Sequence, residues 1–392
     1  MHTYSQRDLI YFDNSATSWP KPPGVAEAMV HFLTGIGASP GRSGHQLAIE
    51  SSRIVYDTRE KISALFNAPD PLHVVFTKNI TEAINLVLYG LLKPGDHVIT
   101  SSMEHNSVMR PLRALEEVGV EITVVQCTPD GMLNPHSIEK AIRANTRLVI
   151  INHSSNVIGT ILPIREIGEI MQKYDVLFLV DTAQSAGRVV IDMAKDHIDL
   201  LAFTGHKSLL GPMGTGGLVL GGRVDSIRIA PLIRGGTGSR SEKERQPEFL
   251  PDAYESGTLN AVGIAGLGAG IDWILEKGVG SIREYEIQLT QQLIDELKVI
   301  SGVTVYSPSD ARMNTGTVSF NISGLTPSEV GLSLDEDFDV LSRVGLHCAP
   351  AAHKTIGTYP SGTIRFGLGI FNTSQEVEGA IQAVAKIAKA AR

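Results

Sequence analysis

Two residues of this chain, Asp181 and Lys207, have the types and the spacing to hold a carbonyl cofactor. Asp181 closes the apolar run VLFLV, and Lys207 follows His206 in FTGHKSLLGP, just after the next apolar run. An amine at a strand end can condense with an aldehyde, and pyridoxal phosphate needs such a lysine together with an acid for its pyridine nitrogen. Taken singly, Lys207 could be a surface charge and Asp181 a helix cap. Together they predict a pyridoxal phosphate site.

Polar residues that follow other apolar runs extend this prediction. Asn79 and Thr81 stand at the start of a helical segment, where free backbone N–H groups and the helix dipole favour a phosphate. His105 in SSMEHNS could stack on a pyridine ring, and Asn156 in NHSSNVIGT could hydrogen-bond to its oxygen. Each of these residues could equally be a helix cap. Convergence on one pocket is the more economical interpretation.

The segment RVGLHCAPAAHK contains Cys348 directly after His347 and five residues after Arg343. On base rates such a cysteine is a buried hydrophobe. As a nucleophile it needs a neighbouring cation to favour its thiolate, and either His347 or Arg343 could supply one. Zinc binding by His347, Cys348 and His353 is a weaker alternative, because no second ligand pair lies nearby. The other cysteine, Cys127, ends the run EITVVQC and is predicted to be structural.

The elements that must position these residues form a regular pattern up to residue 222. Short apolar runs alternate with helix-length segments, which is typical of a mainly parallel sheet covered by helices on both faces. The runs that we interpret as strands are residues 72–77, 96–101, 121–127, 146–155, 176–182, 200–205 and 215–222. Ligands of such sheets lie beyond the carboxyl ends of the strands. The strand-end residues described above are therefore expected to share one pocket.

After about residue 275 the pattern changes to a long helical stretch, four short strand-like segments and a final helix. This mixture predicts a smaller α+β domain. We expect a large domain over residues 15–275 and a small domain that combines residues 1–14 with 276–392 and carries Cys348. No Pro/Ser-rich linker separates the two, so they are expected to pack closely with the site between them.

Composition narrows the functional classes. The chain has 392 residues, 42% of them hydrophobic, and a net charge of −8 without runs of Lys or Arg, which gives no support for nucleic-acid binding. No stretch approaches the ~18 unbroken apolar residues of a membrane span, and the N-terminus lacks the pattern of a signal peptide. We therefore expect no membrane partner, a cytoplasmic location and two free thiols.

The motifs YFDNSATSWPKP, NITEAINLV, VDTAQSAG, FTGHKSLLGP, YESGT, RVGLHCAP and TIRFGLG together resemble the cysteine desulfurase and selenocysteine lyase family. The resemblance covers nearly the whole chain. It implies an α/β fold of the pyridoxal phosphate-dependent, aspartate aminotransferase-like type, with a mainly parallel seven-stranded sheet and a smaller α+β C-terminal domain. It also implies a homodimer, L-cysteine or L-selenocysteine as the substrate, and a sulfur-acceptor protein as partner.

The resemblance further implies a role for each candidate residue. Lys207 would bind the cofactor aldehyde and move protons, His105 would stack on the ring, and Cys348 would take the substrate sulfur as a persulfide and leave L-alanine. Arg365 would clamp the substrate carboxylate, which suits a bidentate guanidinium, with Asn156, Arg343 and His45 close to the substrate. The cofactor-binding residues would be Lys207, Asp181, Gln184, His105, Asn156, Asn79, Thr81, Thr204 and His206, with Thr258 from the other subunit. No metal is implied.

Some features leave alternatives open. Ile80 precedes Thr81 where many relatives carry a second hydroxyl residue, so backbone N–H groups would carry more of the phosphate binding. The same site could serve a selenocysteine lyase or a cysteine-sulfinate desulfinase, in which Cys348 matters less. An aminotransferase is disfavoured by the cysteine in its short loop, and an inactive scaffold is disfavoured by the presence of Lys207, Asp181 and Arg365.

Overall fold

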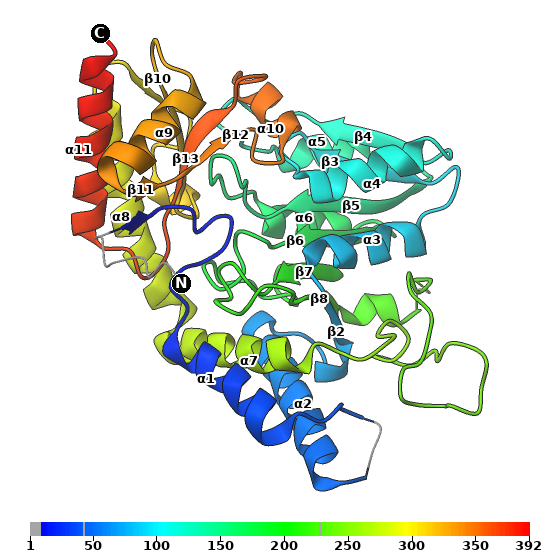
Figure 1. Cartoon of the computed structure of the whole chain (residues 1–392). Helices are drawn as coiled ribbons and strands as arrows, with labels where there is room; N and C mark the ends of the chain where they lie inside the picture. Colours follow the sequence, from blue (N-terminus) through cyan, green and yellow to red (C-terminus); the bar gives the residue numbers. More distant parts are fainter. Residues whose placement is uncertain (1–8, 42–43, 227–228) are drawn as a thin grey trace.

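The computed structural model describes residues 9–41, 44–226 and 229–392. A seven-stranded sheet forms the centre of the larger part of the molecule (Figure 1). Its strands in spatial order are β2 (Val74–Thr77), β8 (Gly216–Leu220), β7 (Leu200–Thr204), β6 (Leu177–Asp181), β5 (Thr146–Asn152), β3 (His97–Ser101) and β4 (Glu121–Val125). Only β8 runs antiparallel to its neighbours. The predicted mainly parallel seven-stranded sheet is confirmed.

Helices cover both faces of this sheet, as the unbroken apolar runs require. Every residue of β3, β6, β7 and β8 is buried, and successive side chains alternate between two hydrophobic clusters. One cluster includes side chains of α2 (Gln46–Phe66), α5 (Pro135–Ala141), α6 (Ile164–Met171) and α7 (Ala261–Lys277), and the other includes side chains of α3 (Ile80–Leu91) and α4 (Asn106–Glu116). α1 (Pro23–His31) and the following π-helical turn (Phe32–Ile36) pack on α7.

The smaller part is built on an antiparallel sheet. Its four strands in spatial order are β12 (Arg343–Gly345), β13 (Thr363–Gly367), β10 (Thr317–Ile322) and β9 (Val303–Val305). Side chains of α8 (Val279–Val299), α9 (Pro327–Phe338) and α11 (Ser374–Ala390) complete its core, while α10 (Pro350–Thr355) follows β12. The N-terminal strand β1 (Ile10–Tyr11) pairs with β11 (Val340–Leu341), and Phe12 enters the same core. Short 3₁₀ turns cover Pro71–His73, Gly222–Ser226 and Ala311–Met313.

The strand-like stretch 340–348 is interrupted in the structure. β11 ends at Leu341 and β12 at Gly345, and the chain then turns through His347 (φ 47°) and Cys348 (φ 59°) before α10 begins. A left-handed backbone cannot continue a strand, so the cysteine lies on a turn between β12 and α10.

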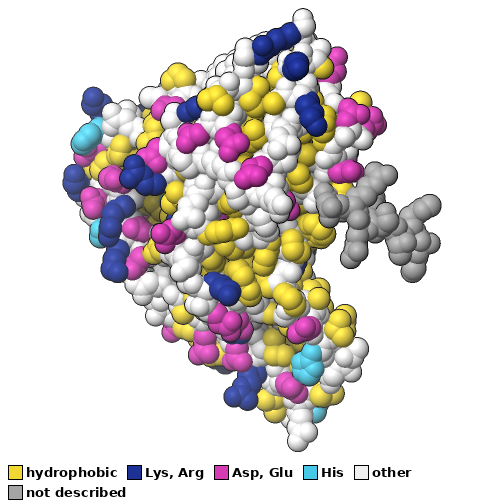
Figure 2. All heavy atoms as spheres, turned by 90° about the vertical axis from the view of Figure 1, so that its left-hand side faces the viewer, with side chains coloured by type: hydrophobic (Ala, Val, Ile, Leu, Met, Phe, Trp, Pro, Cys, Tyr) yellow, Lys and Arg dark blue, Asp and Glu magenta, His cyan; other side chains and the backbone are white. Residues whose placement is uncertain are grey.

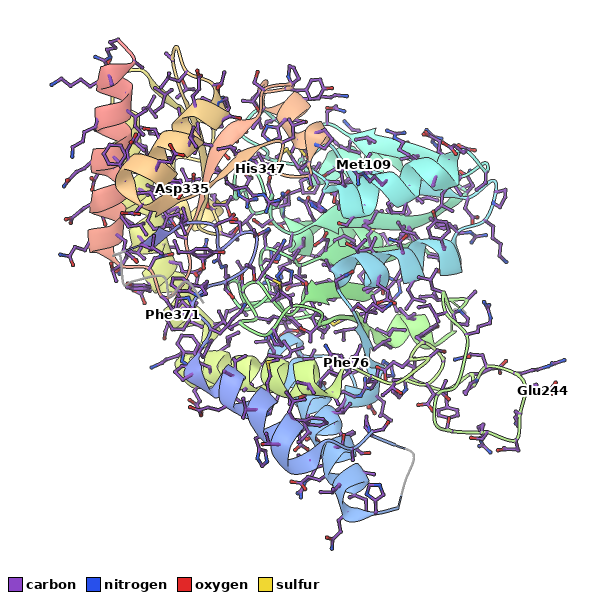
Figure 3. All side chains as sticks on the ribbon, viewed as in Figure 1. Phe76, Met109, Glu244, Asp335, His347 and Phe371 are labelled. Carbon is purple, nitrogen blue, oxygen red and sulfur yellow. The ribbon has the colours of Figure 1, made fainter. Side chains whose placement is uncertain are left out.

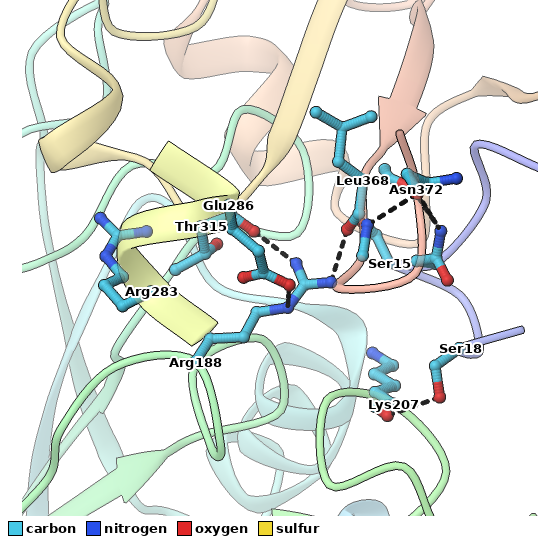
Figure 4. A network of polar contacts seen from close by, with 12 residues as sticks. Ser15, Ser18, Arg188, Lys207, Arg283, Glu286, Thr315, Leu368 and Asn372 are labelled. Atoms are coloured by element: carbon cyan, nitrogen blue, oxygen red, sulfur yellow. Dashed lines mark hydrogen bonds and ion pairs between the residues drawn. The ribbon is translucent and has the colours of Figure 1, made fainter. Parts of the chain in front are cut away.

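Arg188 connects the segment after β6 to the smaller part (Figure 4). Its guanidinium donates hydrogen bonds to the carbonyls of Thr315 and Leu368, and its Nε lies 3.4 Å from a carboxylate oxygen of Glu286 on α8. Both side chains of this ion pair are almost fully buried. Burial raises the pKa of Glu286, while the charges of Arg188 and Arg283 oppose that rise.

The outer surface mixes charged and apolar areas. Figure 2 shows charged side chains spread over one face of the molecule and a stretch of hydrophobic side chains toward its middle. Exposed large hydrophobic residues include Val30 and Leu33, near the end of α1. Among the described residues, none of the helices is both long enough and apolar enough to cross a membrane.

Candidate active site

Lys207 lies in a turn directly after β7 that the N-terminal segment holds in place. Ser18 Oγ donates a 2.8 Å hydrogen bond to the Lys207 carbonyl (Figure 4). The neighbouring carbonyl of His206 accepts hydrogen bonds from Thr17 Oγ1 (3.0 Å) and Lys21 Nζ (2.7 Å). Burial lowers the pKa of Lys207 to about 8, although the charge of Asp181 opposes this shift. Sequence reasoning missed Lys21, whose only signal was its place in the motif SWPKP.

Asp181 ends β6 and is buried, and β6 lies beside β7, which leads into this turn. The backbone N–H of Ala183 donates to its Oδ1 at 2.9 Å. Burial raises the pKa of Asp181, and the Ala183 hydrogen bond and the Lys207 charge oppose this rise. Gln184 is also buried, and its side-chain amide donates to the carbonyl of Ser15 at 2.9 Å. The predicted acid and lysine thus lie at the ends of adjacent strands, and the charge of each affects the pKa of the other.

Three of the predicted cofactor-binding residues carry buried polar atoms without a hydrogen-bond partner in the described part of the chain. These atoms are Oδ1 of Asn156, Oγ1 of Thr204 and Nδ1 of His206. Buried polar atoms in folded proteins are nearly always hydrogen-bonded, so these three atoms are free to bind a polar ligand. Burial lowers the pKa of His206 to about 4, which keeps its ring neutral. This donor and acceptor set fits pyridoxal phosphate.

His105 is the N-cap of α4, beyond the end of β3. Its Nδ1 accepts the backbone N–H of Ser107 at 3.0 Å, which assigns the ring proton of the neutral form to Nε2. Burial lowers the pKa of His105 to about 4, with the Lys207 charge as the next cause. The ring is therefore neutral and fixed in orientation, as a stacking group requires. The capping role that sequence left open is also present.

The residues expected around the phosphate either cap a helix or are exposed. Asn79 caps α3 by accepting the Glu82 N–H at 3.0 Å, so its side chain acts as the alternative helix cap. Thr81 is exposed in the first turn of α3. Thr258 is exposed and lines a groove of about 270 Å³ with Thr77 and Glu82 of the same chain. Whether Thr258 serves a second subunit stays a prediction.

Arg365 on β13 and Arg343 on β12 stand directly opposite each other in the antiparallel register. Arg365 is buried and donates from Nη1 to the Asn156 carbonyl and from Nη2 to Asp13 Oδ1, both at 2.9 Å. Its Nε is buried without a partner in the described residues. Arg343 is more exposed, with its Nη1 4.0 Å from Asp13 Oδ2. Sequence reasoning missed Asp13, although two arginines without an acid were a signal to look for one.

Cys348 is an exposed free thiol on the turn described above. The Asn156 amide donates to the His347 carbonyl at 2.6 Å, and the Asn106 N–H donates to the Cys348 carbonyl at 2.8 Å. Figure 3 shows His347 where the smaller part meets the larger one. Burial lowers the pKa of His347 to about 2, which opposes a cationic ring beside the thiol, and the role of His347 stays a prediction. Arg343 is the other predicted candidate for that role, and the charge of Arg365 also acts on Cys348.

Two predicted residues lie outside this group. His45 is exposed at the N-cap of α2, where its Nδ1 accepts the Ala48 N–H at 3.3 Å, and the structure does not bring it to the other site residues within one chain. Cys127 packs against apolar residues, and burial raises the pKa of its thiol to about 11, which suits the structural role expected for it. The described residues contain no cluster of three or more metal-ligating side chains.

The chain matches the family model "Aminotransferase class-V" over residues 10–379. It belongs to this family. Among its relatives within the family is a "Probable cysteine desulfurase" of Methanothermobacter thermautotrophicus, 37% identical over 95% of this chain and 93% of that protein. A protein of the same name from Pyrococcus abyssi is 34% identical over 98% and 96%.

Solved structures agree with this class V assignment. The apo cysteine desulfurase of Thermococcus onnurineus has a TM-score of 0.90 and 34% identity, with 98% of this chain and 95% of that chain covered. The cysteine desulfurase CsdA of Escherichia coli has a TM-score of 0.87 and 25% identity, with 99% and 96% covered. The predicted family resemblance and the pyridoxal phosphate-dependent transferase fold are thus confirmed.

Proposed function

We propose that this chain is a pyridoxal phosphate-dependent cysteine desulfurase, which converts L-cysteine to L-alanine and holds the sulfur as a persulfide on Cys348. The names of its class V relatives support the activity. The observation that carries the proposal is the position of an exposed cysteine on a turn that is hydrogen-bonded to Asn156, a predicted cofactor-site residue, and to Asn106, which directly follows His105.

When bound, pyridoxal phosphate supplies an aldehyde for the substrate amine and a ring that withdraws electrons from the substrate Cα. Lys207 would hold the aldehyde and Asp181 the pyridine nitrogen, while the neutral His105 ring would lie against its face. Thr204 and His206 would bind the phosphate, together with backbone N–H groups near Asn79 and Thr81. Asn156 and Gln184 would contact the oxygen substituent of the ring.

Lys207 would move the proton at the substrate Cα. A general base works best when its pKa lies near the working pH. Burial lowers the pKa of Lys207 to about 8, so a useful fraction of the amine is neutral near pH 7. Asp181 on the adjacent strand limits this shift and keeps the amine able to hold a proton as well as release it.

Arg365 would bind the substrate carboxylate. Two of its nitrogens are engaged by Asn156 and Asp13, and its Nε is free to donate. Since Arg365 is buried, a carboxylate bound there is held in a region of low dielectric constant, where charge-assisted hydrogen bonds are strong. The clamp fixes the substrate at its carboxylate end and leaves the sulfur to point elsewhere.

Cys348 would receive the sulfur. Its thiolate attacks the substrate sulfur, the Cβ–S bond breaks, and the sulfur becomes the outer atom of a persulfide while the carbon skeleton leaves as L-alanine. An exposed position suits this role, because the persulfide must then be reached by an acceptor. We further propose a cytoplasmic homodimer that passes sulfur to an acceptor protein; the exposed hydrophobic residues Leu232, Ile233 and Phe249 support the subunit contact.

Mass spectrometry of the protein after incubation with L-cysteine tests this proposal. We expect the mass of one added sulfur atom on the peptide that contains Cys348, and one L-alanine released for each sulfur. The Cys348→Ser variant should acquire none. Addition on Cys127 alone, or alanine without any persulfide in the absence of reductant, would refute the assignment.

A further inference from the structure

Asp13 lies between the two arginines of the substrate side and contacts both. The residue forms an isolated bridge with Gly367, at the end of β13, which places it beside the strand that carries Arg365. One carboxylate oxygen is 2.9 Å from Arg365 Nη2 and the other is 4.0 Å from Arg343 Nη1. The carboxylate is partly exposed, with 23% of the side chain accessible, so it borders the open part of the site.

The strand register explains why an acid is needed there. Arg343 and Arg365 are directly opposed on β12 and β13, so their side chains start from the same face of the sheet. Like charges opposed in this way destabilise a sheet, and Arg365 is also buried. Asp13 offsets part of this repulsion. The three groups together leave one net positive charge, which balances the single negative charge of one substrate carboxylate.

The other titratable groups around this cluster are either neutral near pH 7 or the same for every substrate. Burial lowers the pKa of His105 to about 4 and that of His347 to about 2, so both rings are neutral near pH 7. Burial and the charge of Asp13 raise the pKa of Tyr11 to about 12, so its phenol is neutral too. Lys207 is a further cation near the cluster, and the charge of a Cys348 thiolate also acts on Arg365. Both groups are the same for either substrate, so they do not change the difference between one and two anionic groups.

We propose that Asp13 is a specificity-determining residue that restricts the site to amino acids with a single anionic group. This inference rests on the proposed function. L-Cysteine has an uncharged thiol, so its one carboxylate balances the one net positive charge of the cluster. L-Cysteine sulfinate brings a second anionic group, for which Asp13 leaves no free cation. Breaking the Cβ–S bond of the sulfinate with one water gives L-alanine and hydrogen sulfite, so both substrates can be followed through L-alanine.

A charge-compensation cycle tests the role of Asp13. The holoenzyme is compared with Asp13→Asn, Arg343→Gln and the double variant, and kcat/KM for L-alanine release is measured with L-cysteine plus dithiothreitol and with L-cysteine sulfinate. The Asp13→Asn change should raise the sulfinate-to-cysteine ratio by about tenfold or more, because one more positive charge faces the second anion. Arg343→Gln should lower the ratio. The double variant has the wild-type net charge and should return to within about threefold of the wild-type ratio.

An unchanged ratio in Asp13→Asn, or an equal fall for both substrates, would show that Asp13 only positions Arg365 and would overturn the proposal. If Asp13→Asn does not fold, Arg343→Gln tests the proposal instead. Its sulfinate-to-cysteine ratio must be lower than that of the wild type. Wild-type protein that forms alanine from neither substrate would refute the proposed function instead. The relative binding of the two amino acids, followed through the absorbance of the bound cofactor, would then still decide the role of Asp13.

Discussion

The turn that holds Lys207 and the turn that holds Cys348 are built in opposite ways. The lysine turn follows a fully buried strand, and several side chains of residues 17–21 bind its carbonyls. The cysteine turn is exposed at its thiol, has two consecutive residues with left-handed backbone and receives hydrogen bonds from Asn106 and Asn156. Lys207 follows the end of a sheet strand, whereas Cys348 lies on a left-handed turn outside the strands.

This difference separates two chemical tasks. The lysine turn and Asp181 would provide what any reaction of the cofactor needs, and burial sets their pKa values. The cysteine turn would select one reaction among those that the cofactor can support, and its thiol must reach both the substrate and an acceptor. Strained backbone that other contacts hold in place is common at such positions.

Replacing Lys207 should have the largest effect, because the lysine turn would serve every substrate. We expect Lys207→Ala to lower L-alanine formation from both L-cysteine and L-cysteine sulfinate by about 10⁴-fold, the upper range for loss of a general acid–base group. Assays of alanine release with both substrates check this. Retained activity toward either substrate would break the contrast between the two turns.

Replacing Cys348 should affect one substrate only. We expect Cys348→Ala to lower alanine release from L-cysteine by roughly 10³-fold, because the sulfur has no acceptor thiol. Turnover of L-cysteine sulfinate, which releases sulfite without a nucleophile at Cys348, should stay within about threefold of the wild type. The same alanine assay serves, and an equal loss with both substrates would mean that the cysteine turn also shapes the cofactor site.

The ion pair of Arg188 and Glu286 lies between the parts of the molecule that carry the two turns. Arg188→Met removes one partner of a buried pair and should lower the free energy of unfolding by about 3–5 kcal/mol. The matched control is Arg147→Met, since Arg147 pairs with Asp96 at the surface with 59% of its side chain exposed; this change should cost less than about 1 kcal/mol. Denaturant unfolding measures both. Equal losses would mean that the buried pair does not stabilise the contact between the two parts.

The same contrast explains what could be predicted from sequence. The seven strands of the large sheet were readable because runs that are apolar on both faces allow few other structures, and Asp181 and Lys207 stand at their ends. The left-handed turn at His347 and Cys348 was not readable, because neither residue is a glycine and the conformation depends on Asn106 and Asn156.

Charge states that depend on tertiary packing could also not be predicted from the sequence. The neutral state of His347 follows from its burial and from the charge of Arg365, which adjacent sequence does not reveal. Asp13 meets Arg365 across 352 positions of the chain, so its contact with both arginines required the fold. The candidate site was thus predicted well where it depends on strand ends and poorly where it depends on loops that come together from distant segments.

Glu104 gives a smaller test of how strongly burial shifts pKa values near the lysine turn. It is fully buried next to His105, and it accepts hydrogen bonds from Ser101 Oγ at 2.6 Å and from the Asn152 N–H at 3.1 Å. Burial raises its pKa to about 8, so the folded state binds one more proton than the unfolded state between about pH 4.3 and pH 8. The stability that Glu104 contributes is therefore complete at low pH and is lost as the pH rises.

We expect the unfolding free energy of the wild type, minus that of Glu104→Gln, to fall by about 1.4 kcal/mol per pH unit between roughly pH 5 and pH 7.5. Denaturant unfolding of both proteins across this range measures the difference. A difference that stays constant with pH would show that Glu104 is ionised in the folded protein, and that burial is less complete on the lysine side than the structure indicates.

The smallest effect concerns the backbone of the cysteine turn. At φ 59°, any residue other than glycine is strained at position 348 by roughly 1–2 kcal/mol, whereas glycine gains about 0.5–1 kcal/mol of freedom on unfolding. Cys348→Gly should therefore be more stable than Cys348→Ala by about 0.5–1 kcal/mol. The control is Ala114→Gly in the exposed face of α4, which should lower stability by about 1 kcal/mol. Thermal unfolding of the three variants gives the sign at each site. If glycine lowers stability at position 348 as it does at position 114, the backbone of the turn is not strained. The hydrogen bonds from Asn106 and Asn156 then have no backbone strain to offset.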